Sequence, residues 1–193
     1  MKSIMTQSIL AKTILAKSTF RLAQRTLAAG AAILLLAGAL AAQTSWKTYR
    51  YPADGISISM PSEPELSKSN VPTDAGSFEL RAYLSEEGDS ALYVGVCDYG
   101  QVAAGKDPNA ILEGAKNGAI ENVHARLLSS EKITLGIYPG MKFEGENDKF
   151  HFSARVYLVG TTLYQTLIAM PISQHYAGTQ QFMDSFQLIA RTH

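Results

Sequence analysis

The sequence has only one cysteine, Cys97, and no basic cluster beyond its first 42 positions. A single cysteine cannot form an internal disulfide, so the fold must be stabilised by its core. A catalytic thiol needs a nearby histidine or a helix N-terminus to lower its pKa, and the strand-like run around Cys97 offers neither. We therefore interpret Cys97 as a buried packing residue.

Catalytic and cofactor motifs are also missing. The histidines are scattered and form no His-x-x-x-His pair and no Cys-His group, at His124, His151, His175 and His193. No Walker loop, dinucleotide-binding glycine motif or Gly-x-Ser-x-Gly elbow occurs. Acids gather in two predicted turns, 86–89 and 144–148, but neither matches a calcium-binding loop. We expect no metal, no cofactor and no enzymatic activity.

The charge balance changes when the first 42 residues are set aside. The whole chain has 17 basic and 17 acidic residues. Residues 1–42 hold five basic residues and no acid, so residues 43–193 have 12 against 17, a net charge of −5. A nucleic-acid-binding protein needs clustered Lys and Arg to neutralise phosphates. The composition therefore argues against nucleic acid as a partner.

Residues 1–42 have the pattern of a cleavable export signal. Five basic residues precede an uncharged apolar run, Leu27 to Ala42, which ends in the cleavage pattern Ala39-Leu40-Ala41. The run of 16 residues is shorter than the roughly 20 of a spanning helix, so cleavage is favoured over a retained anchor. A basic leader rich in Ser and Thr also fits an organellar transit peptide. We predict a periplasmic or secreted protein with no membrane span after cleavage, and residues 43–193 as one domain.

The centre of the predicted core is a β-hairpin over Arg155 to Met170. Two runs rich in Val, Leu, Ile, Tyr and Thr flank Gly160-Thr161. A two-residue loop places Tyr157 opposite Tyr164, whereas a three-residue loop shifts the pairs by one. Both runs are apolar at nearly every position, which indicates a hairpin covered on both faces in the middle of a sheet.

The other strands are predicted from alternation and turn residues. In 55–60, Ile56, Ile58 and Met60 alternate with serines, which is typical of a strand with one solvent-exposed face. In 76–84 the even-numbered residues from Phe78 to Leu84 are expected to point inward and Tyr83 outward. Residues 138–140 are read as a break between the strands 125–135 and 141–146.

Two helices complete the predicted fold. Asp107 is expected to cap the first, with Pro108 at its first position and an apolar stripe through Ile111 and Ala119. The second is expected at about 173–183. Short turns between successive strands imply antiparallel pairing. The prediction is an α+β fold, an antiparallel β-sheet with a helix packed on each face.

Four segments resemble the exported bacterial domains of the PsbP-like superfamily, which is named for an extrinsic lumenal protein of photosystem II. They are GISISMP at 55–61, the pair Pro139-Gly140, RVYLVGTTLY at 155–164 and FMDSFQL at 182–188. The resemblance spans roughly residues 46–190 and involves core and turn positions. It implies an α/β/α sandwich and a mostly non-enzymatic accessory or docking role.

The one candidate partner-binding patch consists of Arg155, Tyr157 and Tyr164, which can share a face of the hairpin. Arginine and tyrosine are typical of binding surfaces, but a helix covering the two tyrosines would make them core residues instead. Three functions stay open, in this order: an exported accessory module that binds an envelope protein, a carrier of a small apolar lipid or pigment, and a hydrolase assembled from distant residues.

Overall fold

The computed structural model describes residues 46–73 and 76–192, so the predicted export signal lies outside the described residues. The strands in chain order are β1 (Lys47–Tyr51), β2 (Ile56–Met60), β3 (Glu65–Thr73), β4 (Gly76–Glu87), β5 (Ser90–Asp98), β6 (Arg126–Leu135), β7 (Tyr138–Glu146), β8 (Phe150–Val159), β9 (Thr162–Pro171) and β10 (Gln187–Leu188). The helical elements are the 3-10 turn η1 (Gly100–Val102), α2 (Pro108–Asn122) and α3 (Thr179–Asp184).

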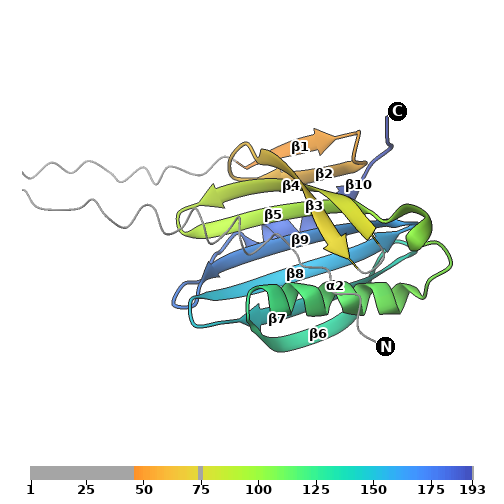
Figure 1. The fold of residues 1–193 in the computed structure, drawn as a ribbon. Coiled ribbons are helices and arrows are strands. Elements are labelled where there is room, and N and C mark those ends of the chain that lie inside the picture. Colours follow the sequence, from red (N-terminus) through yellow and green to blue (C-terminus); the bar gives the residue numbers. More distant parts are fainter. Residues whose placement is uncertain (1–45, 74–75, 193) are drawn as a thin grey trace, which may run out of the picture.

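Seven strands form an antiparallel sheet in the order β3-β4-β5-β9-β8-β7-β6 (Figure 1). The predicted hairpin is β8–β9, and it occupies the middle of this sheet. Tyr157 lies opposite Tyr164, which confirms the two-residue loop. Gly160 adopts φ 61°, the left-handed conformation that such a loop favours. The predicted antiparallel meander, β6 to β9, is also confirmed.

One face of the seven-stranded sheet packs against α2, and we call it the α2 face. Helix α2 begins as predicted, because the Asp107 side chain accepts a hydrogen bond from the Asn109 backbone N–H at 3.0 Å and Pro108 follows the cap. Leu112 and Ala119 of α2 pack in one cluster with buried residues of β7 and β8 such as Phe143. Figure 1 shows α2 lying across the β7–β8 side of the sheet.

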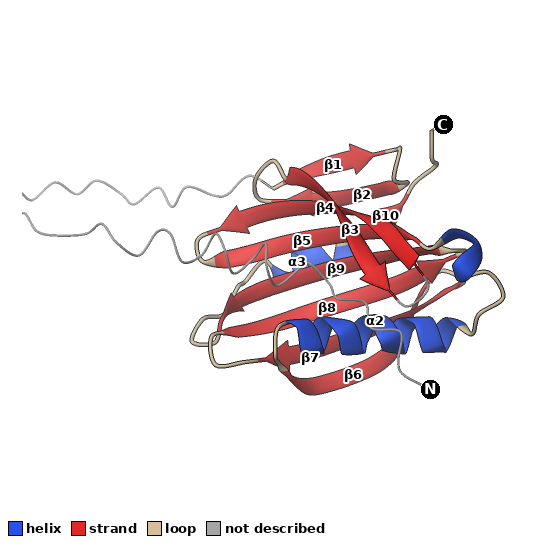
Figure 2. Ribbon diagram, viewed as in Figure 1, coloured by secondary structure: helices blue, strands red, loops and turns tan. Residues whose placement is uncertain are grey.

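The opposite face is covered mainly by a second, three-stranded sheet in the order β1-β2-β10. Ile56, Ile58 and Met60 of β2 are fully buried against it. Phe182 and Met183 of α3 join the same cluster. Figure 2 shows how few helices accompany the strands of this α+β fold. The expectation of a single sheet with a helix on each face did not include this second sheet.

Two details of the strands differ from the prediction. Ser57 of β2 is buried, so the serine side of this strand is not the solvent-exposed face that the alternation predicted. Residues 138–140 are not a break, since β7 begins at Tyr138 and Pro139 lies opposite Thr134. The turn lies just before β7, at residues 136–137, where the φ of 61° at Gly136 suits a two-residue loop.

The second helix is much shorter than predicted. Residues 172–173 and 177–178 form turns on either side of an irregular stretch, and α3 covers only Thr179–Asp184. Gly178 lies beneath the rings of Trp46 and Tyr176, where a Cβ atom would collide with both. Close packing on this glycine, which has poor helix propensity, accounts for the late start of the helix. Within the described residues, no helix is long and apolar enough to cross a membrane.

Candidate functional site

The structure brings the predicted hairpin patch together but places its aromatic rings inside the fold. Tyr157 and Tyr164 are only 5% and 2% exposed. The ring of Phe186 stacks on Tyr157 with centroids 5.9 Å apart and tilts against Tyr164 at 6.0 Å. Arg155 donates to the Met183 carbonyl at 3.1 Å and lies 2.8 Å from the Asp184 carboxylate. These three residues therefore offer a partner almost no aromatic surface.

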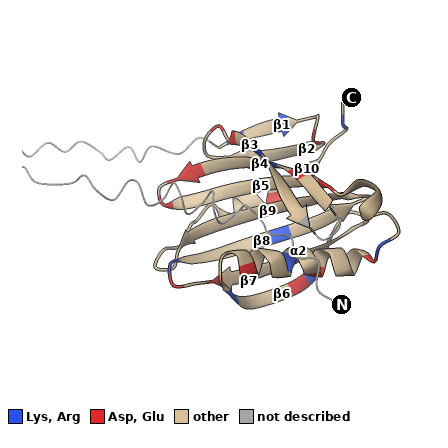
Figure 3. Ribbon diagram, viewed as in Figure 1, with Lys and Arg blue, Asp and Glu red and all other residues tan. Residues whose placement is uncertain are grey.

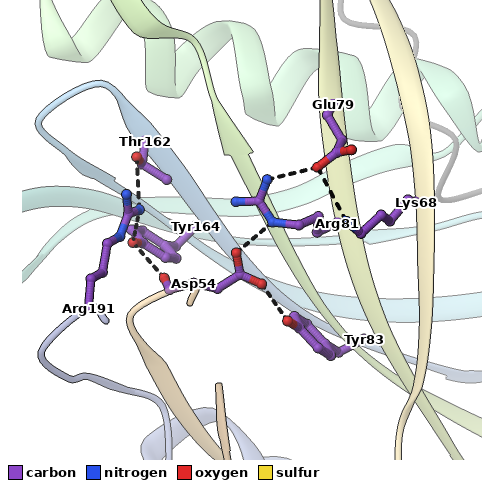
Figure 4. A network of polar contacts seen from close by, with 8 residues as sticks. All are labelled: Asp54, Lys68, Glu79, Arg81, Tyr83, Thr162, Tyr164 and Arg191. Atoms are coloured by element: carbon purple, nitrogen blue, oxygen red, sulfur yellow. Dashed lines mark hydrogen bonds and ion pairs between the residues drawn. The ribbon is translucent and has the colours of Figure 1, made fainter. Parts of the chain in front are cut away.

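A buried polar network fastens the β1–β2 turn to the large sheet (Figure 4). Asp54, in this turn, is 3% exposed. One carboxylate oxygen lies 2.5 Å from Nε of Arg81, and the other accepts a hydrogen bond from the Tyr83 hydroxyl. Both partners belong to β4. Tyr83 is buried there, although the sequence predicted that it faces solvent. A buried carboxylate needs such charge-assisted donors to offset its desolvation.

The backbone of the same turn is held from a third direction. The Tyr164 hydroxyl donates to the Asp54 carbonyl at 3.0 Å, and Arg191 donates to the Tyr164 hydroxyl at 2.7 Å. The C-terminal segment also joins the turn through a backbone bond from Ile189 to Gly55 at 2.8 Å. Three segments that are distant in sequence therefore meet at Asp54 (Figure 4). They are the β1–β2 turn, the central strands and the C-terminal segment.

The electrostatics of this network favour a bracing role over proton transfer. Burial raises the pKa of Tyr83, and its hydrogen bond to Asp54 raises that pKa further. Tyr83 therefore stays protonated and acts as a permanent donor. On the solvent side, the Glu79 carboxylate forms ion pairs with the Arg81 guanidinium at 3.0 Å and with the Lys68 ammonium at 3.9 Å. Every charged group in Figure 4 other than Arg191 has a partner of opposite sign, and Arg191 instead donates to two hydroxyls.

Cys97 is buried on β5, as the sequence predicted. Burial raises the pKa of its thiol to about 11, and the nearby Asp98 carboxylate acts in the same direction. A thiol with this pKa carries almost no thiolate at neutral pH, so it is a poor nucleophile. Among the described residues, no group of three His, Cys, Asp or Glu is placed to hold a metal ion.

An open hollow of about 470 Å³ lies at the end of the sheet where α2 finishes. We call it the end hollow, and it is lined by Val123, His124, Arg126, Glu146, Asn147, Asp148, Lys149 and Ile172. Asn147 fixes its frame, because its Nδ2 donates to the Val123 carbonyl at 2.8 Å and its Oδ1 accepts from the Lys149 backbone N–H at 2.9 Å. The Ile172 backbone N–H donates to the Lys149 carbonyl at 3.0 Å.

His124, on the wall of the end hollow, has φ 50°, the only positive φ among the described residues other than glycine. It occupies the position after the α2 cap, where glycine is usual. The His124 N–H bonds to the Glu121 carbonyl and the Ala125 N–H to the Ile120 carbonyl, which together form a Schellman motif. A histidine in this conformation is mildly strained, and such strain is concentrated at functional sites.

Ile172 is an exposed aliphatic side chain that lines the end hollow, and two more aliphatic residues follow the hollow-lining Arg126 along β6. Ile172 is 52% exposed, and Leu127 and Leu128 at the start of β6 are 40% and 38% exposed. Leu127 lies opposite Gly145, next to the pair formed by Arg126 and Glu146. The sequence analysis considered His124 and the acids of 144–148 separately and did not join them into a site, because the residues of the end hollow come from three separate segments and match no motif.

A scan of protein-family models and a comparison with curated proteins both find no match. Among solved structures, the chain is similar to the solution structure of cyanobacterial PsbP (CyanoP) from Synechocystis sp. PCC 6803. The TM-score is 0.53 at 12% sequence identity, over 75% of this chain and 93% of that chain. This likeness shows a PsbP-like fold, as the sequence resemblance predicted.

Proposed function

We propose that the protein is an exported, non-enzymatic interaction module of the cell envelope. The observation that carries the proposal is the exposed Ile172 in the end hollow, together with the exposed Leu127 and Leu128, which follow the hollow-lining Arg126 along β6. Exposed aliphatic residues grouped together and bordered by charges are typical of protein interaction sites. The export pattern of residues 1–42 and the accessory role implied by the PsbP-like resemblance support the same function.

The end hollow suits a protein partner because its frame is already fixed. Asn147 joins the end of α2 to the β7–β8 turn, so little order is lost on binding. Its charges are of mixed sign, with Arg126 and Glu146 paired to each other and Lys149 and Asp148 beside them. A partner would insert an apolar side chain beside Ile172 and match the charges at the rim.

The test is a crosslinking pull-down from the native envelope fraction with residues 43–193 as bait. Ile172→Asp places a charge in the end hollow, and Ile137→Asp is its matched control, since Ile137 is 89% exposed in the β6–β7 turn. We expect the wild type and I137D to recover the same protein and I172D to lose it. Recovery that does not distinguish the two variants, or no specific protein at all, would overturn the proposal.

A second candidate, a carrier of a small apolar ligand, is favoured by one observation. The hydroxyl of Tyr93 is buried on the α2 face and has no hydrogen-bond partner among the described residues. An unsatisfied polar group among apolar residues is a feature of sites that orient a ligand. Recovery of a stoichiometric lipid or pigment with the bait, lost on Tyr93→Phe, would place this function first.

A further inference from the structure

Strand β6 is an open edge of the seven-stranded sheet. In the described sheet, β6 has a neighbouring strand on the β7 side only. Its first seven residues, 126–132, are all exposed, so side chains on both faces contact solvent. The outer backbone N–H and C=O groups of such a strand are a template on which another extended chain can pair.

The opposite edge of the sheet, β3, is blocked by proline. Pro72 lies within β3 and Pro64 directly precedes it. Proline lacks an N–H and is a common way of protecting an edge from pairing. Strand β6 contains no proline. Its register is irregular between Leu127 and Ser129, which leaves a regular run from Ser129 to Leu135 for pairing.

The charges along β6 favour an acidic partner segment. Arg126 is paired with Glu146, and Glu131 is paired with Lys142 at 2.7 Å. Lys132 makes no ion pair among the described residues. Elsewhere, basic and acidic residues are interspersed over the fold (Figure 3). A carboxylate opposite Lys132 would therefore meet an unmatched cation at the edge of the sheet.

A second copy of the chain fits this edge poorly. Two identical antiparallel strands related by a two-fold axis place one residue opposite itself. Lys132 then always faces an even-numbered residue of the second copy and never Glu131, and centring on either of these residues brings like charges together, which is destabilising. Residues 43–193 also carry a net charge of −5, so two copies repel each other.

The β6 edge leads directly into the end hollow. Arg126, the first residue of β6, lines the hollow, and Leu127 follows beside it. An extended chain lying along β6 would therefore bring its last side chains to the hollow that Arg126 and Ile172 line. Backbone pairing would supply affinity, and the hollow would supply side-chain selectivity.

We infer that β6 and the end hollow together bind an extended segment of a protein partner by strand addition. The segment carries an acidic residue opposite Lys132 and an aliphatic residue at the hollow. This inference rests on the proposed interaction function and specifies the class of partner.

The test uses a synthetic decapeptide that alternates Val and Thr and carries one Glu at its fourth position, titrated into ¹⁵N-labelled residues 43–193. Antiparallel pairing with this Glu opposite Lys132 brings the last residue of the peptide to Arg126 at the end hollow. We expect slower hydrogen exchange and shifted amide signals in β6. A version of the peptide that is N-methylated at alternate residues keeps the side chains but blocks one backbone edge. It should bind at least about tenfold more weakly, because several hydrogen bonds are lost. Equal binding of both peptides, or signals shifted away from β6, would overturn the inference.

Charge reversal tests the register of the segment. Lys132→Glu should weaken binding of the Glu peptide about two- to fivefold, the range of an exposed ion pair, and a Lys-containing peptide should restore it. Lys68→Glu on the β3 edge is the matched control and should change nothing. An equal effect of both variants, or β6 protection caused by self-association without peptide, would contradict the acidic-partner assignment.

The proposed function and this inference fail in different ways. If wild type and Lys132→Glu recover the same envelope protein equally well and the N-methylated peptide binds as tightly as the unmodified one, the function stands and the β6 site is wrong. If the peptide protects β6 but no specific protein is recovered from the envelope, the edge site stands and the proposed function is wrong.

Discussion

The guanidinium of Arg81 lies 2.5 Å from the carboxylate of Asp54, across the boundary between the two sheets. The Arg81 side chain is 21% exposed and that of Asp54 only 4%, so the burial is uneven. Removing the carboxylate costs stability mainly because Tyr83 and Arg81 lose their acceptor together.

We expect Asp54→Ala to lower the free energy of unfolding by about 2–4 kcal/mol, somewhat less than the roughly 3–5 kcal/mol for breaking a fully buried charged pair, because Arg81 is partly exposed. Chemical denaturation monitored by Trp46 fluorescence would measure it. Glu79→Ala is the control, because the Glu79 side chain is 47% exposed and its ion pairs lie at the surface, so a loss of under about 1 kcal/mol is expected. Equal losses in the two variants would show that Asp54 does not brace the sheets.

Two buried tyrosines should respond in opposite ways to loss of their hydroxyls. Tyr93 has no hydrogen-bond partner for its hydroxyl within the described part of the chain, so Tyr93→Phe should leave stability unchanged or raise it by up to about 1 kcal/mol. Tyr164 bonds to Asp54 and Arg191, so Tyr164→Phe should cost about 1–3 kcal/mol. Thermal unfolding of the two variants would measure these changes. A destabilised Y93F would show that the Tyr93 hydroxyl does have a hydrogen-bond partner.

Replacement of His124 by glycine should stabilise the protein. Its φ of 50° suits glycine better than any residue with a Cβ atom. We expect His124→Gly to raise the free energy of unfolding by about 0.5–1 kcal/mol. His124→Ala keeps the Cβ atom and should show no such gain. If H124G is less stable than wild type, the His124 side chain itself contributes a stabilising contact.

Asp98 should make part of the free energy of unfolding depend on pH, with a loss of stability as the pH falls. The Gly100 backbone N–H donates to it at 2.9 Å and lowers its pKa, and the Thr161 hydroxyl at 2.8 Å acts in the same direction. Because the pKa in the fold is below its unfolded value, this contribution is present above about pH 4 and is lost as the pH falls further.

The measurement is the free energy of unfolding of wild type and Asp98→Asn between about pH 5 and pH 2.5. The difference between the two proteins should shrink as the pH falls. A difference that stays constant over this range would show that the ionised form of Asp98 contributes nothing to stability.

Features that depend on neighbouring residues were predictable from the sequence. The Asp107 cap and the two-residue loop at Gly160 each rest on local backbone chemistry. The place of the β8–β9 hairpin at the centre of the large sheet followed from its continuous apolar runs.

Alternation along a strand gives the two faces but not the elements that cover them. The sequence predicted an inward Leu84 and an outward Tyr83, and both are buried, because the sheet is covered on both sides at β4. The same limit applies to Arg155, Tyr157 and Tyr164, which share a face as predicted while Phe186 covers the rings.

The sequence by itself determined the α+β class, the central hairpin and the buried character of Cys97, because periodicity, turn residues and composition act over short distances. The tertiary structure alone decided the split into two sheets, the meeting of Asp54, Arg81 and Tyr83, and the convergence of three loops at the end hollow. Each of these depends on which distant segments become neighbours, and strand order and packing select that arrangement after the local structure has formed.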